Sequence, residues 1–496
     1  MYVNGDRDMT PREILDKCPK GMTVKKINGH YYVYEQKAHK DPKTGKWRAK
    51  SGRCVGKITE EDGFMPNSER PASTKEFGQY RLMEACAHDV YDSLCEKLGH
   101  NGWAADAFIL ACLFLANGFR PIAHIAEHYS QSYLSDYFPS HSLTASSIAK
   151  RLHDFGQRQD GVIAWQQSLI DSSSKRIAID GHAVATSSKY NDLAELGYKS
   201  PKLGSEMMNM MTAYDAERNV SLASRFFEGN KLDKKAILDF VGFFRFKDAL
   251  VIVDKGFTND DFLDPLGESC DYIIPAMKGN SGLKRLLARD RRRDKEFVYR
   301  AGKERQIVQF QEGEDDKGRR VIIYKNRATA DAELAALMED MERNPERFEG
   351  MAKSEIASMK AGFGVICLIT NSKMEAAEVY RWYKKRWRPE TYFDVLKNHM
   401  DFAELGLQDY YEVQGLAFVA VVADQIRRRV WDRVSSLKKG YSLPEYLLKM
   451  RGIKVHKNSS SWTAENLTVK LVAELERMGV STDWGKRYLV PPTPKN

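Results

Sequence analysis

Two runs of apolar residues predict strands that each deliver an acidic side chain. In RIAIDGH, apolar residues alternate with others up to Asp180, which predicts a strand that stops at Gly181 and carries Asp180 at its end. In ALVIVDKGF, four successive apolar residues predict a strand buried on both faces, with Asp254 at its tip. Carboxylates at the ends of neighbouring central strands can converge above a sheet. A lone acid at a strand end is more often a turn cap.

The stretch between these acids predicts a sheet covered by helices. Residues 207–214 and 220–227 alternate like two antiparallel strands joined by a turn. Residues 232–246 then repeat apolar positions at helical spacing, and residues 272–274 form another short strand after Asp254. Three strands, a helix and a buried strand predict an α/β layer architecture.

A later stretch, YKKRWRPETYFDVLK, combines acids with cations on one predicted helix. A proline suits the first helical position, so Glu390 is expected to open a helix on which Asp394 and Lys397 follow at one and two turns. Tyr383 and Arg386 precede it. A solvated amphipathic helix is the alternative, because such charge pairs are common surface features. The two upstream acids favour a site that binds metal and phosphate.

Taken together, these residues resemble the insertion-sequence DDE transposases of the Tyr-Arg-Glu-Lys branch, over about residues 174–434. The resemblance implies a ribonuclease-H-like core, shared with retroviral integrases, and metal-dependent cleavage and strand transfer of DNA. It implies two Mg²⁺ ions, replaceable by Mn²⁺, held by three catalytic carboxylates: Asp180, Asp254 and Glu390. It further implies contacts to the element's DNA ends from Tyr383, Arg386 and Lys397.

The match departs from the family after the second acid. Family members often carry Arg and Tyr there, whereas this chain has Lys255, which keeps the charge, followed by Gly256 and Phe257. We therefore expect Lys255 to contact DNA without help from a neighbouring hydroxyl. His182, two residues after Asp180, is interpreted as a core histidine or a support for the site rather than as a ligand.

The long separation of Asp254 from Glu390 predicts an inserted subdomain at 276–363, between core halves at 174–275 and 364–434. The insert combines a basic run, a hairpin around an acidic turn and a helical stretch over 331–359. Similar enzymes can stack a flipped base on a tryptophan here. This insert has none, so that role would pass to an aromatic that is otherwise core: Phe297, Tyr299 or Tyr324.

Charge distribution predicts DNA contacts ahead of the core. The formal net charge is +9, and residues 1–60 hold 14 Lys and Arg against 7 Asp and Glu. In the β-rich module at 1–66, aromatics alternate with cations that include Lys46 and Arg48, which suits a β-ribbon on a DNA backbone. An edge hairpin protected by lysines explains the pattern equally well. Residues 67–160 are expected to be helical, with SLTASSIAKRLHDF as a helix of a DNA-binding helix-turn-helix.

Several other functions find little support. There is no apolar run of membrane-spanning length, no signal-peptide core, no phosphate-binding glycine loop and no CxxC pair among seven cysteines. We expect a cytoplasmic, nucleoid-associated prokaryotic protein with reduced thiols and without membrane or nucleotide partners. The pattern HIAEH, from His124 to His128, matches inverted zinc peptidases, but so short a pattern recurs by chance.

The C-terminal residues do not decide between related functions. A helix over 413–434 is expected to pack on the core and to dimerise or touch DNA, and 435–496 is expected to be a polar tail. The partners implied are terminal inverted repeats, target DNA and a second copy of the chain on DNA. The alternatives are a catalytically silent DNA-binding derivative and a ribonuclease-H-like nuclease or resolvase that cuts without strand transfer.

Overall fold

The computed structural model describes residues 11–40, 45–59, 63–66, 73–100, 102–118, 122–138, 143–188, 190–196, 205–231, 233–254, 260–277, 280–288, 295–387, 392–393, 396, 404–457, 462–482 and 488–489. The chain forms two compact units. The first comprises Met1–Lys75 with Lys454–Asn466, and the second comprises Glu76–Ile453 with Leu467–Asn496.

The first unit contains a four-stranded antiparallel sheet in the order β1-β2-β3-β4. Its bounds are β1 (Met22–Ile27), β2 (His30–Lys40), β3 (Trp47–Thr59) and β4 (Gly63–Pro66). The predicted hairpin is present as β2 and β3, which pair from Tyr31 and Ile58 to Lys40 and Trp47. A small core of Ile14, Val33 and Ile58 supports the sheet. Among the side chains of the sheet whose burial is described, the cations Lys25, Lys26, Arg53 and Lys57 are exposed.

Residues 435–496 contain more structure than their polar composition predicts. They form α17 (Leu443–Arg451), β17 (Lys454–Lys457), β18 (Trp462–Glu465) and α18 (Val469–Arg477). In the first unit, β17 lies between β18 and β5 (Ser73–Glu76). In the second unit, Glu474 is 1% exposed and accepts hydrogen bonds from Lys439 and Lys449 at 2.7 and 2.6 Å. The backbone N–H of Tyr488 also donates a hydrogen bond to Glu84 of α2 (Gly78–Cys86) at 3.0 Å, so the segment is part of the fold rather than a tail.

The second unit is built on a mixed sheet that has eleven strands in the described part of the chain. The order is β12-β13-β14-β15-β11-β10-β6-β8-β7, with β9 on β8 and β16 on β6. The core strands are β6 (Arg176–Thr186), β7 (Glu195–Leu196), β8 (Glu206–Asp215), β9 (Val220–Glu228), β10 (Leu250–Val253), β11 (Asp271–Pro275) and β16 (Glu404–Leu405). The predicted meander, helix (α9, Asp233–Phe243) and short strand are therefore present.

Both faces of the central strands are buried, as the run LVIV predicts. Val251 and Val253 face one core cluster, together with Ile177 and Ile179. Leu250 and Ile252 face a second cluster, which packs against α14 (Ala376–Lys384). Alternate residues of β10 thus support opposite layers, which is typical of a central parallel strand.

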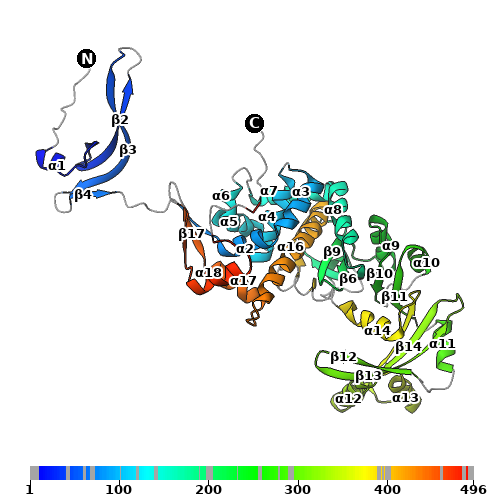
Figure 1. Cartoon of the computed structure of the whole chain (residues 1–496). Coiled ribbons are helices and arrows are strands. Elements are labelled where there is room, and N and C mark those ends of the chain that lie inside the picture. Colours follow the sequence, from blue (N-terminus) through cyan, green and yellow to red (C-terminus); the bar gives the residue numbers. More distant parts are fainter. Residues whose placement is uncertain are drawn as a thin grey trace. The chain divides into compact units, whose positions relative to one another are not determined.

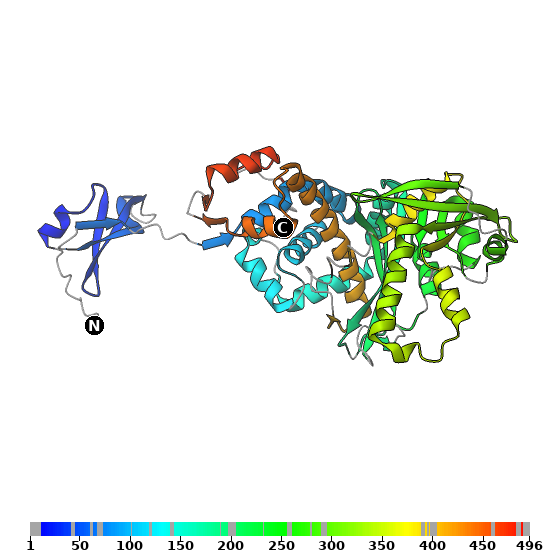
Figure 2. The same ribbon diagram turned by 90° about the horizontal axis from the view of Figure 1, so that it is seen from below.

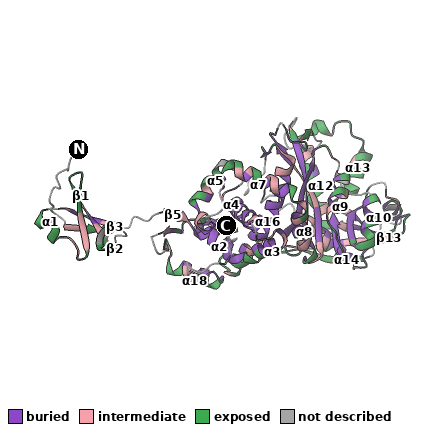
Figure 3. Cartoon of the chain, turned by 90° about the horizontal axis from the view of Figure 1, so that it is seen from above, coloured by how far each residue is buried: buried purple, intermediate pink, exposed green. Residues whose placement is uncertain are grey.

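The insert continues the core sheet instead of forming a sheet of its own. Its bounds are β12 (Lys295–Ala301), β13 (Glu304–Glu314), β14 (Arg320–Asn326), α12 (Arg327–Arg343) and α13 (Lys353–Ala361). β14 pairs with β15 (Val365–Thr370), which in turn pairs with β11. The helical stretch expected over 331–359 is present as α12 and α13, with a break after Arg343, where Pro345 lacks the N–H that would continue the first helix. Figure 3 shows how little of α13 is buried.

One long helix, α16 (Tyr410–Ser436), joins the helical region to the sheet. It packs against β9 on one side and against helices of the region 78–171 on the other, as Figures 1 and 2 show in orange. Those helices are α2 (Gly78–Cys86), α3 (His88–Leu98), α4 (Trp103–Asn117), α5 (Ile122–Gln131), α6 (Leu134–Tyr137), α7 (Ala145–Gln157) and α8 (Gln159–Asp171). Their predicted role in DNA recognition stays a prediction.

Helix α7 meets α16 at backbone contact. A Cβ atom on Gly156 would lie 2.0 Å from the carbonyl oxygen of Tyr411, and one on Gly415 would lie 1.9 Å from that of Leu152. Only glycine allows so close a crossing. The apolar face of α7, with Ile148 and Leu152, is therefore buried within the unit.

Side chains of helix α16 cover the outer edge of β9. Gln414 accepts a hydrogen bond from Phe226 N at 3.2 Å and donates one to Phe226 O at 2.8 Å. Asp424 accepts a hydrogen bond from Ser221 N at 2.7 Å, and Gln425 donates one to Ser221 O at 2.6 Å. These polar groups satisfy a strand edge that would otherwise be buried without partners.

Candidate active site

The two predicted strand acids lie beside each other. β6 and β10 are parallel neighbours, with Ile179 of β6 opposite Val253 of β10. The next residue along β6 is Asp180, and the residue that follows β10 is Asp254. Residues opposite each other in a parallel pair face the same side of the sheet. The acids therefore share the face against which α14 packs, the side opposite Ile179.

The position of Asp180 within its strand differs from the prediction. β6 does not end at Gly181 but continues to Thr186, because β8 pairs with it from Ile177 to Ala185. Asp180 thus lies in the middle of a strand, and its Oδ1 accepts a hydrogen bond from Gly181 N at 2.8 Å. Asp254 follows β10 directly, as predicted.

Arg386 reaches these acids from the end of α14. Its Nη1 lies 3.3 Å from Asp254 Oδ2, and the two side chains are 30% and 42% exposed. Burial lowers the pKa of Arg386, but Tyr383, Asp254 and Asp180 raise it more, so the net shift is upward. The guanidinium is therefore a permanent cation between the acids and solvent.

The ring of Tyr383 packs against the guanidinium of Arg386. Its ring lies under the guanidinium at 5.0 Å, and the residue is only 6% exposed. Burial raises the pKa of Tyr383, partly offset by Arg386. The buried ring is placed to support the arginine, and the predicted contact of Tyr383 with DNA stays a prediction.

Further cations surround this part of α14, although the sequence interpretation did not single them out. Lys385 Nζ lies 3.9 Å from the ring centre of Trp382, and the guanidinium of Arg176 lies 5.5 Å from the same ring. The run YKKRWR was the available signal. Together with Arg386, these residues form a basic margin along α14 and the start of β6, and within it Arg386 contacts Asp254.

The signature helix is only partly visible. Glu390, Asp394, Lys397 and Lys255 lie outside the described residues. Tyr392, Phe393 and Leu396 are buried, and the Phe393 ring stacks on His182 at 4.8 Å and 17°. His182 therefore packs against the segment that follows Glu390, as expected of a supporting residue.

Two carboxylates of the predicted metal site, Asp180 and Asp254, lie within the described residues. Within the described ranges, no three His, Cys, Asp or Glu side chains are grouped to hold a metal ion. Asp180 and Asp254 nevertheless supply hard oxygen donors on one face of adjacent strands, which fits Mg²⁺. The third predicted ligand, Glu390, is among the residues not described.

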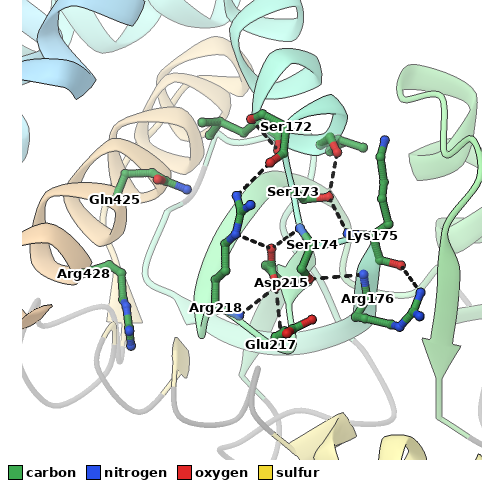
Figure 4. Close-up of polar contacts among 12 residues, drawn as sticks. Ser172, Ser173, Ser174, Lys175, Arg176, Asp215, Glu217, Arg218, Gln425 and Arg428 are labelled. Carbon is green, nitrogen blue, oxygen red and sulfur yellow. Dashed lines mark hydrogen bonds and ion pairs between the residues drawn. The ribbon is translucent and has the colours of Figure 1, made fainter.

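Another buried acid of the core, Asp215, has a structural role. Asp215, at the opposite end of β6 from Asp180, accepts hydrogen bonds from Ser174 N and Oγ and from the backbone N–H groups of Glu217 and Arg218. Figure 4 shows these contacts holding the β8–β9 turn against the start of β6. Asp215 is therefore a structural residue and not part of the site.

The residues around the zinc-peptidase pattern, His124 to His128, do not suit a zinc ion. His124 and Glu127 are exposed, while His128 is half-buried on the same helix. Burial lowers the pKa of His128, and the nearby cation Arg451 lowers it further. A neighbouring arginine opposes a divalent ion, and no third ligand is grouped there in the described part of the chain.

The insert's aromatic residues belong to the core. Tyr324 is 0% exposed and donates a hydrogen bond to Ala376 O at 2.8 Å. Phe297 and Tyr299 meet Tyr380 edge to face, with ring centres at 5.6 and 5.2 Å. These contacts favour the core interpretation over base stacking.

Of the predicted N-terminal contacts, Lys46 is exposed. The side chain of Arg48 is outside the described set, although its backbone belongs to β3. Nearby, Lys25 and Lys26 lie over the rings of Tyr34 and Tyr31 at 5.1 and 5.8 Å.

Comparison with known proteins identifies the family to which the chain belongs. The family model for the transposase DDE domain matches residues 171–423, just over half of the chain, so the protein belongs to that family. No curated protein matches. Among solved structures, the chain is similar to one titled "Cryo-EM structure of piggyBac transposase synaptic complex with hairpin DNA", at 10% identity and a TM-score of 0.40 over 76% of this chain and 79% of that one.

No helix in the described segments is long and apolar enough to cross a membrane.

Proposed function

We propose that this protein is a DNA transposase that cleaves the ends of an insertion sequence and joins them to target DNA. The observation that carries the proposal is the placement of Asp180 and Asp254 on one face of adjacent parallel strands, inside a chain of the transposase DDE family. Glu390 completes the acidic set, because it lies between Arg386 and the buried Phe393 in sequence, and both of those residues contact this site or its flank.

Asp180, Asp254 and Glu390 would hold two divalent metal ions. Bound Mg²⁺, or Mn²⁺ in its place, would supply Lewis-acid stabilisation of the attacking and leaving oxygens at one phosphodiester. The chain's own part is to fix the carboxylates on a rigid sheet. Because β6 and β10 are buried on both faces, a shift of either acid would require movement of the core.

The basic margin of α14 would hold the DNA backbone beside the acids. Arg386 offers a planar guanidinium that suits a phosphate, and Tyr383 fixes its orientation from below. Lys397 and Lys255 are proposed to add further cations that contact the DNA. Contacts of this type position the strand without reading its sequence.

The N-terminal unit would bind the element's ends. Its sheet carries Lys46 and Arg48 on the β2–β3 hairpin, and its small core leaves cations and aromatic rings at the surface. Such a surface suits double-stranded DNA at terminal inverted repeats and would act in a homodimer assembled on DNA. We place this activity in a prokaryotic cytoplasm, at the nucleoid, with no membrane or nucleotide partner.

Plasmid nicking and joining distinguish this proposal from its alternatives. A plasmid that carries the element's ends should be cut only when Mg²⁺ or Mn²⁺ is present, and the freed 3′ ends should appear covalently joined to a target plasmid. Binding without cutting would identify a silent derivative. Cutting without joined products would identify a nuclease or resolvase.

A further inference from the structure

The two outer edges of the large sheet differ in whether other parts of the chain cover them. The edge of β9 is covered by side chains of α16, through Gln414, Asp424 and Gln425. At the opposite edge, β12 pairs with β13 and with no other strand in the described part of the chain. An uncovered edge strand presents a row of backbone donors and acceptors to any strand that can approach it.

β12 carries charged side chains near its ends, Lys295, Glu296 and Arg300, but it lacks two other features that protect an edge strand, a proline and a bulge. It contains no proline, and it pairs with β13 in unbroken register over all seven residues. At its centre, Val298 is 52% exposed, and its partner Ile307 on β13 is 41% exposed. An exposed apolar pair on an open edge is a common place for strand addition.

The sequence of β12 is complementary to itself in the antiparallel direction. In the strand KEFVYRA, the residues that flank Val298 symmetrically are an aromatic pair, Phe297 and Tyr299, and a charge pair, Glu296 and Arg300. If two copies pair with Val298 opposite Val298, each Glu296 faces Arg300 of the partner subunit, twice by symmetry. Neither Glu296 nor Arg300 forms an ion pair within the described residues of its own chain.

We propose that two copies of this chain dimerise by antiparallel pairing of their β12 strands about a twofold axis at Val298. The pairing would extend one sheet through both subunits and would satisfy the open edge with a second copy rather than with a helix. This pairing would form the dimer interface of the proposed transposase. Only its biological role rests on the proposed function. The pairing itself can be measured without DNA and without cleavage.

Charge reversal tests the register. In sedimentation equilibrium of the full chain at micromolar concentration, Glu296→Arg should weaken the dimer about tenfold or more, because two attractive pairs become repulsive. Arg300→Glu should do the same. The double variant should return to nearly wild-type affinity, because the swap restores both pairs. Glu342→Arg makes the same change on the exposed face of α12 and should have no effect.

Cysteine cross-linking tests the axis. Two Val298→Cys subunits should form a disulfide-linked dimer on mild oxidation, since directly opposed residues of an antiparallel pair lie within disulfide reach. Ile307→Cys is the matched control on the next strand. Its symmetry mate would lie three strand spacings away, about 14 Å, and should not cross-link.

The outcomes separate this inference from the proposed function. A monomeric wild-type chain, single charge variants that dimerise normally, or a double variant as weak as the singles would each overturn the β12 dimer. Equal cross-linking of Ile307→Cys would overturn the register. Failure of the plasmid assay would leave these results unchanged, and Asp254→Asn should dimerise like the wild type.

Discussion

The contact between α7 and α16 predicts a large effect from a single methyl group. Changing Gly415 to Ala would place a Cβ atom 1.9 Å from the carbonyl oxygen of Leu152. The two helices would have to separate by about 1.5 Å to reach ordinary van der Waals distance. Because α16 also covers the edge of β9, that movement would disturb Gln414 and its two bonds to Phe226 as well.

The expected magnitude follows from two opposing contributions. Replacing glycine by alanine inside a helix gains up to about 1 kcal/mol of helix propensity. Overpacking against backbone costs about 3 kcal/mol or more, because a carbonyl cannot move aside as a flexible side chain can. We therefore expect Gly415→Ala to lose about 2 kcal/mol or more, visible as a lower urea midpoint and a melting temperature reduced by several degrees.

Gly242 provides the matched control. It is an exposed glycine of α9, and a Cβ atom there would meet nothing within 4 Å. Gly242→Ala should therefore stabilise the chain by about 0.5–1 kcal/mol. If Gly415→Ala were as stable as the wild type, or stabilised like Gly242→Ala, the account of α16 as a tightly packed link between helices and sheet would be wrong.

Four other predictions concern the edge of the sheet, the signature helix and the N-terminal unit. Gln414→Leu should cost about 2–4 kcal/mol in urea unfolding, because it leaves the N–H and C=O of one buried residue unpaired. Glu390→Gln should stop cleavage with both Mg²⁺ and Mn²⁺, whereas Asp394→Asn should cost much less; a dead Asp394 variant beside an active Glu390 variant would reverse the assignment. Lys397→Ala should weaken assembly on end DNA, more so as salt is added, without altering metal preference. Deletion of residues 1–66 should weaken end binding and flatten its salt dependence by about one unit per lost phosphate contact, and an unchanged slope would assign the unit to folding or dimer contacts.

Local pattern was sufficient to predict the centre of the fold. The run LVIV predicted a strand buried on both faces, and alternate residues of β10 do enter opposite cores. The position of Asp180 was harder to predict. A glycine after an acid resembles a strand end, but pairing with β8, a strand distant in sequence, carries β6 on to Thr186.

Long-range pairing also explains what the sequence left hidden. The insert continues the core sheet because β14 pairs with β15, across two intervening helices. The structure of 435–496 depends on a buried Glu474 held by two lysines, which composition reports only as polarity. The signature predicts that Tyr383 contacts DNA, which stays a prediction, but it gave no sign that the ring is buried beneath Arg386.

The central claim is that Asp180 and Asp254 act together in metal-dependent cleavage of the element's ends. The most direct test measures cleavage and end binding in parallel for wild type and Asp254→Asn, with Asp180→Asn as its partner. An amide keeps the shape of the side chain and removes the charge that a metal ion requires. We predict that both variants bind end DNA nearly as tightly as wild type and cut none of it with either Mg²⁺ or Mn²⁺. Metal-dependent cutting by either variant at the wild-type rate would contradict the assignment.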